Sequence, residues 1–484
     1  MAVMGVFRQT GRVLHDALSF VVFSFLDILD LILCFAFKAV DFIVEAEWKP
    51  CYCTSAKEAI TSSGKILVSE QGESKIVCLT STRLGLEEIS DTLYSRPSLV
   101  SEFSKSTINE LRRFKVEDKS STVTVLSSEK NMIKKGTTRS TFTVNSTIVE
   151  MLRGKIGGQQ LHPTSRWSDC DCKFCTRWTT SSKQTLFVRA EGPKDKAKED
   201  VLFVHGFISS SAFWTETLFP NFSNAVKSTY RLFAIDLLGF GRSPKPADSL
   251  YTLGEHLDMI EQSVLEPYKV KSFHIVAHSL GCILALALAV RHPGSVKSLT
   301  LLAPPYYKVP KGALAAQHVM KQVAPRRVWP LITFGASIAC WYEHITRAVC
   351  LVICKNHRLW EFLTKLVTQN RIKTFLIEGF CCHTHNAAWH TLHNIICGTG
   401  SKLDGYLDSV RDHLKCDVNI FHGRNDELIP VECSYNFQQK VPRAQVKVID
   451  DEDHITIVVN RQEVFARELE EIWRGGDHVK NGYY

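Results

Sequence analysis

From about residue 184 onward, short apolar runs alternate with longer helical stretches, and this rhythm restricts the possible fold more than any other feature. The helical stretches include Leu253–Leu265, Cys282–Arg291 and Val431–Lys440. The runs with strand character are 186–188, 201–204, 232–235, 273–276, 299–302, 418–421 and 446–449. Strands that alternate with helices form a parallel sheet with helices on both faces. We therefore expect an α/β domain over residues 184–475.

One expected strand leads into a short turn that carries a serine. The turn is Ala277-His278-Ser279-Leu280-Gly281, between the run 273–276 and a helical stretch. A serine at a sharp strand–turn–helix junction is the nucleophile elbow of the α/β-hydrolases, usually Gly-x-Ser-x-Gly. Ala277 replaces the first glycine and adds only a methyl group where strand and helix must approach. Taken alone, the turn fits equally well with Ser279 as a simple helix N-cap.

An acid and a base follow the serine in the chain order that this fold uses. Asp426 follows the run 418–421 in a glycine-containing turn, and Glu427 is the runner-up. His454 follows the run 446–449 and precedes the C-terminal helix. A serine hydroxyl needs a base, and the base needs an orienting carboxylate. The order Ser279, Asp426, His454 therefore predicts a catalytic triad.

Two backbone N–H groups are candidates for the oxyanion hole. One belongs to Leu280, directly after the nucleophile. The other belongs to Phe207, because Gly206 lets the chain turn inward after the run 201–204. We expect His205 to brace this loop. We expect His278 to pack away from Ser279 and to take no part in the chemistry.

Residues 305–400 interrupt the alternation. They contain mainly helical segments and no clear strand, between the runs 299–302 and 418–421. An insertion at this position is where a lid would lie. We therefore predict a helical lid over about 305–400 within the domain 184–475.

The first 50 residues form a hydrophobic segment. Asp27, Asp30, Cys34, Lys38, Asp41 and Glu45 fall on one narrow helical stripe, and the other positions are mostly apolar. Such a helix can lie in a membrane interface with its stripe toward water, or serve as a signal or anchor. Packing against the soluble domain is the alternative. We expect a membrane-associated protein of the secretory pathway that contacts the membrane surface through this segment.

Residues 51–183 form an N-terminal extension from which we derive no chemistry. They are rich in Ser, Thr, Lys and Glu, with short strand-like runs such as 65–68, and residues 100–140 have the composition of a partly flexible segment. The net charge of the chain is +8, with a local excess of Lys and Arg in this region. No nucleic-acid motif accompanies that excess, so we expect no nucleic-acid partner.

Two groups of cysteine and histidine resemble metal sites. Cys170, Cys172 and Cys175 lack a fourth ligand at regular zinc spacing, so a structural thiol or disulfide role is favoured over metal binding. The segment from Cys381 to His393 has no nearby carboxylate and lies in an apolar, tryptophan-containing stretch. We therefore predict no metal and no cofactor.

Taken together, these motifs resemble the α/β-hydrolase superfamily over residues 184–475. The resemblance includes a loop signature, Asp-x-x-Gly-x-Gly-x-Ser. The matching segments are His205-Gly206-Phe207, Asp236–Ser243, the serine turn, Asp426 and His454.

Over nearly its whole length the chain also resembles the Bodyguard family of plant proteins. The segments that carry this resemblance are 48–55, Ser168–Cys175, Ala277–Cys282 and His383–Asn394. Ala277 departs from the superfamily pattern but not from that of this family. The resemblance implies a probable lysophospholipase or acyl-ester hydrolase that acts in cuticle formation, at the plasma membrane or in the cell wall.

Three functions are compatible with the sequence. The first is a serine esterase acting on lipid acyl esters without a cofactor. The second is an acyltransferase that passes the same acyl group to an alcohol and builds lipid polyester. The third is a non-enzymatic protein that uses the fold to bind a ligand. The intact triad argues against the third function, whereas the sequence does not separate the first from the second.

Overall fold

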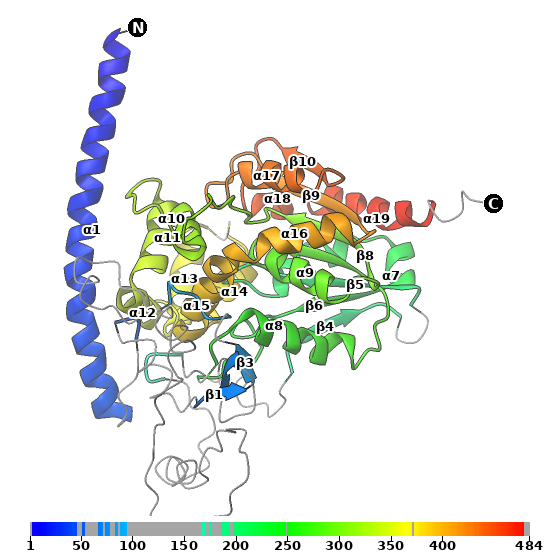
Figure 1. Ribbon diagram of the computed structural model, residues 1–484, viewed down its shortest axis with the longest axis horizontal. Helices are drawn as coiled ribbons and strands as arrows, with labels where there is room; N and C mark the ends of the chain where they lie inside the picture. Colours follow the sequence, from blue (N-terminus) through cyan, green and yellow to red (C-terminus); the bar gives the residue numbers. More distant parts are fainter. Residues whose placement is uncertain are drawn as a thin grey trace, which may run out of the picture.

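The computed structural model describes most of the chain outside the N-terminal extension (Figure 1). The described residues are 2–45, 51–53, 66–70, 73–77, 83–85, 88–93, 166–170, 172, 175, 185–193, 197–247, 249–369 and 372–478. The segment 100–140, which we expect to be flexible, lies outside them. Part of the extension forms a small antiparallel sheet of β1 (Ile66–Glu70), β2 (Glu73–Val77) and β3 (Arg83–Gly85).

A seven-stranded sheet forms the centre of the α/β domain. Its strand order is β10-β9-β8-β7-β5-β6-β4, and every neighbouring pair is parallel except β4 with β6. The strands are β4 (Val188–Glu191), β5 (Glu199–Val204), β6 (Tyr230–Ile235), β7 (Phe273–His278), β8 (Val296–Leu302), β9 (Asp417–Gly423) and β10 (Gln445–Ile449). The predicted, mostly parallel sheet is confirmed, although β4 begins two residues after the start of the expected run 186–188. The carboxyl ends of the parallel strands meet at one edge, where the predicted site residues follow them.

Helices cover both faces of this sheet, as predicted. Alternate residues of β5 point to opposite faces: Leu202 and Val204 pack in one core cluster, Val201 and Phe203 in the other. The first cluster includes residues of α8 (Leu253–Ile260), η4 (Glu261–Leu265), α9 (Leu280–Arg291), α16 (Leu403–Asp412) and α17 (Glu432–Lys440). The second includes residues of α6 (Ala212–Thr215), η3 (Phe219–Asn221), α7 (Asn224–Thr229), α18 (Thr456–Val459) and α19 (Gln462–His478).

Between β8 and β9 the described residues form helices joined by loops, with no strand among them, in the region predicted to be a lid. This lid region contains α10 (Ala315–Val323), α11 (Leu331–Trp341), α12 (Glu343–Val352), α13 (His357–Val367), α14 (Thr374–Cys381), α15 (His385–Thr391), η5 (Leu392–Cys397) and η6 (Gly398–Ser401). It forms one end of the molecule, beside the long helix α1 (Ala2–Glu45) (Figure 1). The lid region is therefore placed between α1 and the central sheet.

The polar stripe of α1 faces protein, so the expectation that it points toward water is wrong. Asp30 is fully buried, and Cys34 and Asp41 are each 3% exposed. The reason is that the lid region supplies partners: Asp27 pairs with Arg326, and Asp41 pairs with Arg347. The opposite side of α1 is apolar and exposed, including Phe20, Phe25, Ile32 and Phe35. The part Leu14–Glu45 is long and apolar enough to cross a membrane.

Candidate active site

Ser279 lies where β7 ends and α9 begins, in a strained backbone conformation. Its φ is 53° and its ψ is −119°, values that a non-glycine residue rarely adopts. Its backbone N–H donates to the carbonyl of Leu302 at 2.8 Å, which fixes the turn against β8. Ser279 occupies the N-cap position of α9, but its side chain makes no capping hydrogen bond to the helix. Backbone strain of this kind is often found at functional sites.

Close packing around the turn explains its small residues. A Cβ atom on Gly281 would lie 2.7 Å from the carbonyl oxygens of Val204 and His205. A Cβ atom on Gly206 would lie 3.2 Å from the Cβ of Ser279. The loop after β5 therefore lies directly against the serine, and Ala277 is fully buried beneath it.

Asp426 and His454 lie in direct contact at the ends of β9 and β10. The imidazole Nδ1–H of His454 donates to Oδ2 of Asp426 at 2.6 Å. The other carboxylate oxygen accepts from the backbone N–H groups of Leu428 and Ile429 at 2.9 and 2.8 Å. Burial opposes ionisation of Asp426, but the bond from His454 and these N–H groups hold its pKa below the usual value. Glu427, the runner-up, is exposed.

His278 connects the turn of Ser279 to the loop of His454. This connection was not predicted from the sequence. The Nε2–H of His278 donates to the backbone carbonyl of His454 at 2.8 Å, and the two rings lie 4.6 Å apart. Burial lowers the pKa of His278 to about 3, so the ring is neutral at physiological pH. His278 does pack in the interior, against Phe213. In addition, its bond to His454 ties the loop of His454 to the turn of Ser279.

Two further histidines hold the surrounding loops. His205 donates from Nδ1 to the carbonyl of Gly206 and accepts from the N–H of Leu237 at 2.9 Å, so it braces this loop as expected. His422 accepts from the hydroxyl of Ser434 and donates to the carbonyl of Ile429, and so supports the loop of Asp426. Neither ring has a nitrogen left for proton transfer.

The second oxyanion candidate lies in a well-supported loop. Phe207 packs against Phe240, with the ring centroids 5.9 Å apart. Asp236 holds the neighbouring backbone by accepting from the N–H groups of Ser211 at 2.5 Å and Arg242 at 2.7 Å. Leu280 is fully buried at the start of α9. The oxyanion roles of Phe207 and Leu280 stay predictions.

The cysteine groups belong to other parts of the chain than Ser279, Asp426 and His454. Cys170, Cys172 and Cys175 have no fourth ligand at regular zinc spacing in the sequence, but the fold brings His357 of α13 beside them. The segment from Cys381 to His393 does not form one site, because its histidines have different partners. His383 lies beside Cys350 and Cys354, whereas His393 bonds to Thr92.

Comparison with known proteins agrees with this fold. A family profile described as "alpha/beta hydrolase fold" matches residues 201–329. The chain is 62% identical to "Probable lysophospholipase BODYGUARD 3" of Arabidopsis thaliana, over 98% of this chain and 99% of that protein. It is 58% identical to BODYGUARD 1 of the same plant, over 96% of this chain and 97% of that protein. The chain therefore belongs to the BODYGUARD family and has the α/β-hydrolase fold.

Proposed function

We propose that the chain is a serine hydrolase that cleaves acyl esters of lipids. The observation that carries the proposal is the hydrogen bond of 2.6 Å between His454 and Asp426, in loops that His278 joins to the strained turn of Ser279. A buried, ionised carboxylate that accepts from Nδ1–H leaves Nε2 of the imidazole with a lone pair, as a general base requires.

In the proposed mechanism, Ser279 attacks the ester carbonyl while His454 takes its proton. Asp426 orients the imidazole and stabilises its charged form. The N–H groups of Phe207 and Leu280 stabilise the oxyanion. His454 then protonates the leaving alcohol, and a water molecule activated by the same histidine releases the acid. No metal or organic cofactor takes part in these steps.

A lipid substrate is supported by the relatives and by the apolar surface near the lid region. The relatives carry the name probable lysophospholipase. Exposed apolar side chains are present on α1, and also on α11 and α13 of the lid region, for example Leu331, Phe362 and Leu366. A surface of this kind suits contact with a membrane, from which a lipid ester would enter. The resemblance to the family further suggests a role in cuticle formation at the plasma membrane or cell wall.

The nucleophilic role of Ser279 can be tested by covalent labelling. A fluorophosphonate probe should label the full-length protein on Ser279, and Ser279→Ala should abolish labelling. The same variant should lower turnover of a lysophospholipid by roughly 10⁴-fold or more, because the nucleophile is lost. Ser409→Ala, on α16, is the matched control and should behave as the unaltered protein. Unchanged turnover in Ser279→Ala would refute the proposal.

Product analysis decides between hydrolysis and acyl transfer. With a panel of lipid esters and added glycerol, hydrolysis yields the free acid as the main product. If acylated glycerol is the main product instead, the chain is a transferase that uses the same acyl-enzyme.

A further inference from the structure

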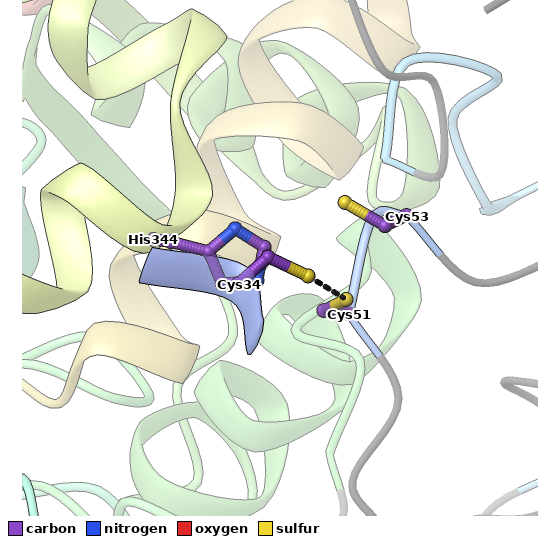
Figure 2. Close-up of side chains that lie close together, drawn as sticks. All are labelled: Cys34, Cys51, Cys53 and His344. Atoms are coloured by element: carbon purple, nitrogen blue, oxygen red, sulfur yellow. Dashed lines mark hydrogen bonds between the residues drawn. The ribbon is translucent and has the colours of Figure 1, made fainter. Parts of the chain in front are cut away.

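Three cysteines and one histidine from distant parts of the chain converge beside α1 (Figure 2). Cys34 lies on α1, Cys51 and Cys53 follow that helix, and His344 lies on α12 of the lid region. One ligand atom from each residue lies within 4.8 Å of all the others. Cys34, Cys51 and His344 are buried, and Cys53 is half-buried. We call these four residues the α1–lid thiol group.

The histidine of this group is arranged as a metal ligand. Its Nδ1 lies 3.1 Å from a carboxylate oxygen of Asp30, to which Nδ1–H donates. Its Nε2 is buried and has no hydrogen-bond partner among the described residues. Asp30 itself is held by the hydroxyl of Tyr52 and by two backbone N–H groups of α12. Metal-binding histidines typically donate their second N–H to a carboxylate in this way, which fixes the tautomer and directs the other nitrogen at the metal.

The spacing of the sulfur atoms fits a tetrahedral ion better than a disulfide. The Sγ atoms of Cys34 and Cys51 lie 4.0 Å apart. Zinc–sulfur bonds of about 2.3 Å place two thiolates of a tetrahedral site about 3.8 Å apart. A disulfide needs about 2.05 Å and would leave the third thiol and the histidine nitrogen unused. Three cysteines and one histidine make a complete ligand set for structural zinc.

We propose that Cys34, Cys51, Cys53 and His344 bind one Zn²⁺ ion that joins α1 to the lid region. On binding, the three thiols release their protons to solvent and the neutral imidazole coordinates through Nε2. Three thiolates and one divalent ion leave a single net negative charge. Lys38, one turn further along α1, interacts with the sulfur atoms of Cys34 and Cys51 and offsets that charge.

The proposed ion has a structural role. The chain supplies all four ligands, so no coordination position stays open for substrate or water. None of the four belongs to the strands or loops that carry Ser279, Asp426 and His454. The ion would hold the carboxyl-terminal half of α1, and the segment after it, against α12.

The second thiol group, Cys170, Cys172, Cys175 and His357, is less well arranged for one ion. Cys170 approaches Nδ1 of His357 at 3.5 Å, whereas Cys172 approaches Nε2 at 3.8 Å. Nδ1 also lies 3.1 Å from the carbonyl of Cys354, whereas the ring of His344 is fixed by the carboxylate of Asp30. The proposal is therefore made for the α1–lid thiol group alone.

Metal analysis of the full-length protein, purified in detergent without chelators, tests the proposal. Three variants should each contain about one zinc atom fewer per chain than the unaltered protein: Cys34→Ser, Cys53→Ser and His344→Ala. The matched control Cys416→Ser changes a buried cysteine outside the thiol groups and should keep its zinc. Cys170→Ser should also keep the zinc that depends on Cys34. Equal zinc content in Cys34→Ser and the unaltered protein would overturn the assignment.

Ligand-exchange variants separate coordination from folding. Cys53→His and His344→Cys keep four zinc ligands, so they should retain the ion that Cys53→Ser and His344→Ala lose. Cobalt in place of zinc should give sulfur-to-cobalt charge transfer that disappears in Cys34→Ser. Loss of zinc in His344→Cys, with native circular dichroism and melting temperature, would overturn the ligand role. A disulfide between Cys34 and Cys51, found by mass spectrometry of unreduced protein without zinc, would overturn it as well.

Discussion

At the scale of single residues, the candidate site depends on groups that hold Ser279 and His454 in place. The strained φ of Ser279 persists because its N–H is bonded to Leu302 and because glycines on both sides let the neighbouring backbones approach. His278 adds a tie between the serine turn and the histidine loop. The carboxylate of Asp426, in turn, is oriented by two backbone N–H groups as well as by His454.

The adjacent carboxyl groups Asp426 and Glu427 allow a matched test of the acid. Asp426→Asn should lower kcat by about 10³- to 10⁴-fold near neutral pH, because an amide favours the wrong tautomer of His454. Glu427→Gln should have little effect, because that side chain is exposed. Steady-state kinetics on a short acyl ester, with circular dichroism as a check of folding, provides the measurement. A larger loss in Glu427→Gln than in Asp426→Asn would reverse the assignment.

The sequence was informative about this site where the relevant pattern is local. A serine between a strand and a helix, followed by an acid and a histidine after later strands, can be read from the order of the residues. The hydrogen bond from His278 to the carbonyl of His454 could not be predicted in this way, because it depends on how two residues 176 positions apart approach each other. The proposed ligand His344 was missed for the same reason: it lies far along the chain from Cys34.

At the scale of elements, the most informative contact is the one between α1 and the lid region. Helical periodicity identified the polar stripe of α1 but could not identify what the stripe faces. Solvent and a partner helix impose the same spacing of polar residues on a helix. The structure places Arg326, His344 and Arg347 opposite Asp27, Asp30 and Asp41. The stripe is therefore an interface within the chain.

The buried pair of Asp41 and Arg347 should stabilise this interface measurably. The two terminal guanidinium nitrogens, Nη1 and Nη2, donate to the carboxylate at 2.7 and 2.6 Å, and the guanidinium lies over the rings of Phe37 and Trp167. Asp41→Ala leaves the charge of Arg347 buried without its carboxylate, at a cost of about 3–5 kcal/mol. We expect a lower melting temperature in detergent, and tryptic cleavage after α1 at a lower temperature.

An exposed pair supplies the control for this prediction. Arg411 pairs with Asp408 and Asp412 on the surface of α16, so Arg411→Ala should change the melting temperature little. The double variant Asp41→Leu with Arg347→Met removes both buried charges and should recover much of the stability. Equal effects of Asp41→Ala and Arg411→Ala would show that α1 does not depend on the buried pair.

At the scale of the whole molecule, several histidines are buried in neutral form. Burial lowers the pKa of His256 to about 4 and the pKa values of His278 and His393 to about 3. These residues lie in α8, at the end of β7 and in η5, so the effect is spread over both the central domain and the lid region. In the unfolded chain each imidazole has an ordinary pKa of about 6.5.

Stability should therefore fall as the pH is lowered from about 6.5 to 5. In this range the unfolded chain binds protons that the folded chain does not, so the free energy of unfolding decreases with decreasing pH. Each buried neutral histidine contributes a slope that approaches about 1.4 kcal/mol per pH unit near pH 5 and fades as the pH rises above 6.5. Melting temperatures across a pH series at constant ionic strength provide the measurement.

His256→Gln should lower stability at pH 7 but give a shallower pH dependence, whereas His413→Gln, at an exposed position, should leave the dependence unchanged. A pH dependence equally steep in His256→Gln and the unaltered protein would contradict a neutral, buried His256.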